Sequence, residues 1–403
     1  MGLIGPIGPI GLIRLMGLMG LMGFWGSCSE EQVVEPVVKQ QVAVEVHPYV
    51  LAYEDIAMTR AWLPPTDYFL VAGTEDNSIG IAFTQDGQEP EYGHFFKSGE
   101  TWRSSVNITT AGTYYLYGYA PHTTGMSCEI SSSETPNDNS AYSDGAVLTI
   151  KNVPAVTPND VCVLVGAKNG KDDYKADPLD FSVTGLVPGQ FEYEAQTMGP
   201  GGGANYAFLL FDHLFSSLQL RFNLNAEYAA LRSIKIKELG LRTYSNLADD
   251  GSVNMKKYDV TIKLQKTLDG SSPIVKDNGG NDIITFLPSS VPGNQQDVNG
   301  TVFFTSDGGE NLPVEPGYTT FFANFVPAGV KKLVLTSTYD VYDNKGNKIR
   351  EGCTAENTIK LNIFNGQTET FRGRRYTIEL TVNPTYLYMM SDPDLDNPTL
   401  EIK

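Results

Sequence analysis

Apolar and polar residues alternate along several short segments of the chain, most regularly in its second half. Leu218, Leu220, Phe222 and Leu224 are separated by polar residues, so one face of an extended segment would be apolar. The same pattern recurs in 234–237, 359–363 and 376–382. Strands with one apolar and one wet face are typical of antiparallel sheets packed face to face. The pattern therefore predicts an all-β fold of the sandwich kind.

The first half carries a weaker form of the same pattern. Val42, Val44 and Val46 alternate with Ala43 and Glu45, which places the three valines on one face of a strand. Pro48 interrupts this strand, which could continue beyond a kink over 49–53. Further strands are expected at 68–72, 78–83, 114–119, 146–150 and 161–165, and a polar surface loop is expected over 120–145.

A glycine-rich segment, 199–203, divides the chain into two blocks of strands. Its sequence, GPGGG, does not favour a regular strand, and it lacks the Lys and the following helix of a phosphate-binding loop. We therefore expect two tandem antiparallel β-sandwich domains, one over 61–198 and one over 204–403. Only residues 225–232 suggest a short helix.

The N-terminal segment resembles a bacterial lipoprotein signal. Residues 1–27 are almost wholly apolar with Arg14 as their only charge, and the stretch from Leu15 to Ser27 has the length of a secretion signal's core rather than of a membrane span. Gly26 and Ser27 stand before Cys28, which predicts a cleaved signal and an acylated Cys28; the alternative is an ordinary signal with a chance cysteine. Residues 28–60 would form a tether and a first strand.

The charge of the chain excludes one class of partner. Its 47 acidic residues outnumber 29 Lys and Arg residues, giving a net charge of −18, and no basic cluster interrupts the acidity. Such a surface repels phosphate backbones, so we expect no nucleic-acid binding.

The sequence offers no convincing catalytic arrangement. None of the four histidines lies in a motif with a nucleophile, and no Gly-x-Ser-x-Gly is present. His213 lacks ligand companions at a plausible spacing, which favours a partly buried histidine at a strand edge over a metal ligand. We expect neither an enzyme nor a bound cofactor or metal. The remaining cysteines, whose state the sequence leaves open, are Cys128, Cys162 and Cys353.

The two ends of the folded part carry the features of greatest interest. Arg60 precedes Ala61 in a segment that leads into two prolines, which makes it a target for a trypsin-like protease or else a plain surface arginine. The tail 384–403 either forms an edge strand on its own domain or extends toward a neighbouring molecule. Its two alternating apolar sets are Tyr386, Tyr388 and Met390, then Leu400 and Ile402.

Taken in order along the chain, several segments resemble the fimbrillins, the subunits of the type V pilus of Bacteroidetes. The segments are the lipobox at Cys28, Thr59-Arg60-Ala61, 78–81, 114–119, 213–222 and 373–380. The resemblance implies two transthyretin-like β-sandwiches and export as a surface lipoprotein of the outer membrane. It also implies a cut after Arg60 that frees the strand containing Val42, Val44 and Val46. The vacated groove would receive a strand from residues 384–403 of the next subunit.

This interpretation makes the chain a structural subunit of a fimbria whose partners are other pilus subunits. An anchor or tip subunit is a variant of the same interpretation. The alternative is a surface lipoprotein that does not polymerise and binds a glycan or host ligand.

Overall fold

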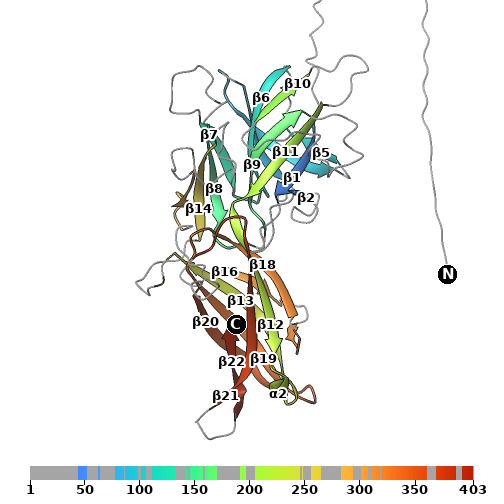
Figure 1. The fold of residues 1–403 in the computed structure, drawn as a ribbon, viewed down its shortest axis with the longest axis vertical. Coiled ribbons are helices and arrows are strands. Elements are labelled where there is room, and N and C mark those ends of the chain that lie inside the picture. The colour runs from blue at the N-terminus through green and yellow to red at the C-terminus, as the bar shows by residue number, and fades with distance from the viewer. Residues whose placement is uncertain are drawn as a thin grey trace, which may run out of the picture. The chain divides into compact units, whose positions relative to one another are not determined.

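The computed structural model describes residues 44–51, 62–63, 78–85, 87–98, 101–105, 111–131, 142, 146–157, 159–169, 191–196, 205–245, 247, 256–264, 283–293, 301–306, 311–317, 319–360, 369–386 and 393–402. The described residues are almost entirely strands, as Figure 1 shows. Their only helix is α2 (Ala226–Ala229), where the Asn225 side chain caps the backbone N–H groups of Glu227 and Tyr228. No helix in this described part is long and apolar enough to cross a membrane. The predicted all-β sandwich class is confirmed.

The first sheet closes on itself. Its strand order is β10-β6-β3-β4-β5-β1-β11-β9, and β9 also pairs with β6 through Tyr119↔Val163 and Ala120↔Cys162. Its strands are β1 (Val44–Leu51), β3 (Ile79–Thr84), β4 (Glu91–Ser98), β5 (Thr101–Ser104), β6 (Gly112–Ala120), β9 (Cys162–Asn169), β10 (Glu192–Ala195) and β11 (Asn205–His213), with β2 (Trp62–Leu63) paired to β1. The closed sheet surrounds a core that includes Val46, Ile81, Phe95, Leu116 and Phe211.

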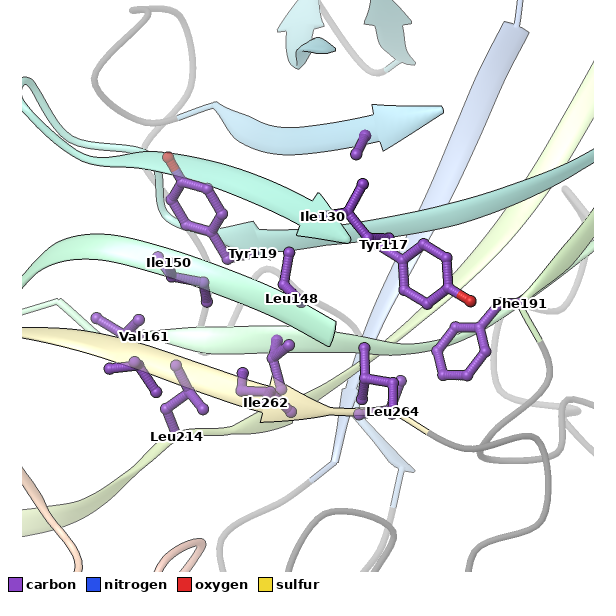
Figure 2. Packing of buried hydrophobic residues seen from close by; sticks show 14 of the residues in the cluster. Tyr117, Tyr119, Ile130, Leu148, Ile150, Val161, Phe191, Leu214, Ile262 and Leu264 are labelled. Carbon is purple, nitrogen blue, oxygen red and sulfur yellow. The ribbon is translucent and has the colours of Figure 1, made fainter. Parts of the chain in front are cut away.

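A second sheet shares another core with the closed sheet. It has the order β15-β14-β8-β7, formed by β7 (Ser127–Ser131), β8 (Val147–Pro154), β14 (Lys257–Lys263) and β15 (Ile284–Pro288). Figure 2 shows Tyr117 of the closed sheet in one cluster with Leu148 and Ile262 of the second sheet. The ring of Phe191 stacks on Tyr117 with 4.8 Å between centroids. Both faces of β6 are therefore used for packing, since Leu116 faces the other core.

Two further sheets enclose the third core. One has the order β18-β12-β21-β22, from β12 (Phe215–Leu224), β18 (Thr319–Pro327), β21 (Arg375–Tyr386) and β22 (Pro393–Ile402). The other has the order β16-β13-β19-β20, from β13 (Arg232–Tyr244), β16 (Thr301–Thr305), β19 (Lys332–Asp343) and β20 (Lys348–Lys360), with β17 (Leu312–Val314) paired to β13. The alternation predicted for 218–224 is confirmed, because Leu218, Leu220, Phe222 and Leu224 are all buried here.

Strand pairing crosses the predicted limit between residues 198 and 204 in two places. β11 follows that limit in the chain but pairs with β1 and β9. β14 pairs with β8, although it lies within the predicted second domain. The limits 61–198 and 204–403 do not coincide with the sheets, because the wholly buried segment 205–213 completes the first sheet.

Two local expectations from the sequence are wrong. Residues 127–131, expected in a surface loop, form β7 and bury Ile130. The interruption expected at Pro48 does not occur: β1 runs through it to Leu51, which is the continuation that the sequence left open. Pro48 cannot donate a backbone hydrogen bond, yet it is paired with Leu209 and the parallel register of β1 and β11 continues without a shift on both sides of it. The predicted strand 68–72 lies outside the described residues.

Candidate functional site: the N-terminal strand

Strand β1 is paired along both of its edges. It runs parallel to β11, from Val44↔Asn205 to Val50↔Phe211, and antiparallel to β5, where Val46 faces Trp102. In Figure 1 it lies beside β11 within the closed sheet. Val44 and Val46 therefore lie in a strand, as the alternation predicts, whereas Val42 lies outside the described residues.

Both faces of β1 are packed. Val44, Val46 and Val50 belong to the core inside the closed sheet, and Val46 is only 1% exposed. On the opposite face Tyr49 stacks on Phe208 with 5.9 Å between ring centroids. Burying a valine contributes about 1.5–3 kcal/mol, so the three valines contribute roughly 5–9 kcal/mol to holding this strand.

Loss of β1 would leave a slot with a defined shape and chemistry. On β11, the residues paired with Val46, Pro48 and Val50 also face the core of the closed sheet. They are Ala207, Leu209 and Phe211, in that order. On the other side Trp102 of β5 is buried beside Val46. Backbone groups of β5 and β11 would lose their partners, and two such edges around an apolar floor are a template for another strand.

The segment after β1 returns the chain to the same strand. β2 pairs antiparallel with the end of β1 through Val50↔Leu63 and Leu51↔Trp62. Arg60 and Ala61 fall between these paired strands, outside the described residues, as does Cys28. A cut after Arg60 would therefore break the covalent link between β1 and the rest of the chain. β2 would remain part of the C-terminal product.

The C-terminal tail lies on its own chain. β22 is an edge strand that pairs antiparallel with β21, from Leu380↔Ile402 to Tyr386↔Pro393. Leu400 is partly buried and, with Phe222 and Val382, lines an apolar pocket. Of the two arrangements that the sequence left open, the structure has the edge strand. Tyr388 and Met390 lie outside the described residues.

Two histidines form a small polar group near β6. His94 and His122 have ring centroids 4.4 Å apart, Nδ1 of His122 lies 2.7 Å from the Tyr119 hydroxyl, and Nδ1 of His94 lies 3.1 Å from Oγ of Ser78. Ser78 is only 1% exposed, so its hydroxyl is not presented to a substrate. This contact gives no support to a hydrolase.

The expectation for His213 is wrong. Its side chain is fully buried rather than partly exposed, and it has companions: Nδ1 lies 2.8 Å from a carboxylate oxygen of Asp160 and 3.4 Å from Sγ of Cys162. No pattern in the sequence predicts this cluster, because Cys162 and His213 meet only through the β9–β11 register. Burial, and secondarily the charge of Asp160, raises the pKa of the Cys162 thiol well above its usual value.

The other cysteines also have defined states. Cys128, Cys162 and Cys353 are all free thiols. Burial raises the pKa of Cys128 to about 12, which makes it unreactive near neutral pH. None of these three residues therefore forms a disulfide, which settles the state that the sequence left open.

Comparison with known proteins found matches among solved structures. No family model matches the chain, and no curated protein matches it. A candidate cell adhesion protein from Bacteroides uniformis is 11% identical, with a TM-score of 0.35 over 92% of this chain and 98% of its own. A candidate cell adhesion protein from Bacteroides fragilis is 10% identical, with a TM-score of 0.36 over 90% and 97%.

A third solved structure is the fimbrial anchor protein Mfa2 from Porphyromonas gingivalis. It is 10% identical, with a TM-score of 0.25 over 89% of this chain and 97% of its own. All three likenesses are remote. The assignment of a function rests on strand β1 instead.

Proposed function

We propose that this chain is a structural subunit of a cell-surface fibre, a fimbria, and that it assembles by exchange of strand β1. The observation that supports the proposal is the position of β1, paired with β5 and β11 and buried through Val44, Val46 and Val50. The resemblance of several sequence segments to fimbrillins agrees with it. β1 is also the first described strand and precedes Arg60, so one proteolytic cut could release it.

In this proposal the chain reaches the surface as a lipoprotein. Acyl chains on Cys28 anchor it to the outer membrane, with each buried methylene contributing about 0.8 kcal/mol. A surface protease then cuts after Arg60 and separates both the anchor and β1 from the folded part. The subunit that remains carries the slot between β5 and β11.

A strand from the next subunit fills this slot. The donor is the tail 384–403, which exchanges an edge position beside β21 for a position paired on both sides. Each additional backbone hydrogen bond contributes about 0.5–1.5 kcal/mol net, in addition to the buried side chains. Because one end of each subunit binds a different site on the next, the contact is heterologous and builds a filament.

The proposal is tested by limited proteolysis of the purified full-length chain. Treatment with trypsin is expected to give a ladder of multimers that resists SDS unless heated. An Arg60→Ala variant, treated in the same way, is the matched control and should remain monomeric. Monomers alone from the wild-type chain, with the cut after Arg60 made, would reject strand exchange.

A second candidate function is supported by the position of β22. Because the tail already pairs with β21, the chain could remain a monomeric surface lipoprotein or a pilus anchor that binds a glycan, a host ligand or a neighbouring subunit. N-terminal sequencing of the protein stripped from cells separates the candidates. A start at Ala61 supports the fibre subunit, whereas an acylated Cys28 supports the anchored protein.

A further inference from the structure

A buried group of polar side chains lies where β9 and β11 pair. Asp160 precedes β9, Cys162 begins it, and His213 ends β11 directly opposite Cys162 in the register. Potential ligand atoms of all three residues lie within 4.8 Å of one another. Each residue is almost fully shielded from solvent, with the most exposed of them, Asp160, at 5%.

Charged residues also adjoin this group. Asp212, beside His213, forms a 2.8 Å ion pair with Nη1 of Arg372. Nη1 also donates a hydrogen bond to the His213 carbonyl oxygen. Nδ1 of His213 lies 2.8 Å from a carboxylate oxygen of Asp160. Buried carboxylates need such compensation by a cation, a proton or hydrogen bonds.

We propose that Asp160, Cys162 and His213 form a binding site for a divalent transition-metal ion, with zinc as the best-suited metal. Thiolate, imidazole and carboxylate are the ligands zinc takes in proteins. Binding releases the Cys162 thiol proton to solvent, and the imidazole binds through Nδ1 with its proton on Nε2. The thiolate and the two carboxylates then balance the metal ion and the Arg372 guanidinium.

The distances fit such a site after a small adjustment. Tetrahedral zinc with bonds of about 2.3 Å to sulfur and about 2.0 Å to nitrogen separates these ligand atoms by about 3.5 Å. Sγ of Cys162 lies 3.4 Å from Nδ1 of His213. The two carboxylate oxygens of Asp160 lie 3.0 Å and 2.8 Å from the same nitrogen, so the carboxylate must retreat by about half an ångström.

A metal here would fasten β9 to β11 beside Leu214, the residue between β11 and β12. Because β11 also pairs with β1, the metal would stiffen one wall of the proposed slot. The binding site itself does not depend on strand exchange, and its test needs no polymer.

The test measures metal content directly. The full-length chain, without an affinity tag, is produced in zinc-supplemented medium and dialysed against a chelator, since a buried ion is expected to survive dialysis. Elemental analysis should find about one zinc per wild-type chain. Cys162→Ser should lose at least nine-tenths of it, whereas the control Cys353→Ser, at a half-buried thiol on β20, should keep it all.

Two outcomes would overturn the proposal. One is wild-type protein with less than a tenth of an equivalent of zinc, and the other is equal zinc in wild type and Cys162→Ser. If Cys162→Ser does not fold, wild-type protein from cobalt-supplemented medium decides. A thiolate-to-cobalt charge-transfer absorption supports the site, and its absence overturns it.

Discussion

Replacing one buried valine of β1 by alanine should lower the stability of the fold and weaken the binding of β1 to the rest of the sheet. Val46 is 1% exposed and packs inside the closed sheet beside Trp102. Val46→Ala removes two carbon atoms, worth about 0.8 kcal/mol each, and leaves a small cavity. We expect the free energy of unfolding of the intact chain to fall by about 2 kcal/mol.

The same substitution should accelerate the release of β1 once the chain is cut. If the whole loss of about 2 kcal/mol raises the dissociation rate, the rate rises up to about 30-fold. Urea denaturation of the intact chain measures the first effect. Gel filtration after trypsin treatment, which follows the departure of the N-terminal fragment, measures the second.

A valine elsewhere supplies the control for both measurements. Val302 of β16 is 48% exposed, so Val302→Ala should change the unfolding free energy by no more than about 0.5 kcal/mol and leave the release rate unchanged. If Val46→Ala destabilises the intact chain but releases the fragment at the wild-type rate, β1 is not the strand that leaves. If it does not destabilise the intact chain, Val46 does not contribute to the core as described.

Two further substitutions test the first two sheets. Gly118→Ala would place a Cβ 2.3 Å from the backbone oxygen of Gly80 on β3, so we expect a loss of about 3 kcal/mol or more, seen as a lower denaturation midpoint. An unchanged midpoint would show that β3 and β6 are not this close. Burial alone would raise the pKa of Asp259, but hydrogen bonds from the backbone N–H groups of Asn152 and Ser290 outweigh it and hold the pKa below its usual 3.8. The carboxylate therefore stabilises the fold above pH 3.8, and this stabilisation is lost as the pH falls through its lowered pKa. Asp259→Asn should reduce the free energy of unfolding by about 1.5–3 kcal/mol at pH 7 and by less near pH 2. Denaturation at both pH values measures the two losses. An equal cost at both pH values would contradict this role.

The sequence predicts which face of a strand is buried better than it predicts which other strands that strand pairs with. Alternation identified the buried sides of β1 and β12, because a period of two depends only on which face meets the core. It did not indicate that β1 pairs with β11 or that β14 pairs with β8, since these partners are chosen by packing between distant segments. His213 shows the same limit, because Asp160 and Cys162 lie about fifty residues before it and meet it only through the pairing of β9 with β11.

The boundary between the blocks of strands shows a different limit. Composition pointed to the glycines at 199–203, where a turn or linker costs little. The chain instead passes from the closed sheet to the next sheet at Leu214, a fully buried residue between two strands. No turn-forming residue marks this point, so composition had no means of finding it.

The pairing of β1 with β11 also constrains the order in which the protein can fold. Of the described strands, β1 is synthesised first, but the strand that covers its parallel edge is complete only when residue 213 has been made. Contacts between such distant segments form slowly, and unpaired strand edges are prone to wrong association. The nascent chain therefore carries an exposed row of valines through most of the synthesis of its first sheet. A factor that shields extended apolar segments should improve the yield of folded protein.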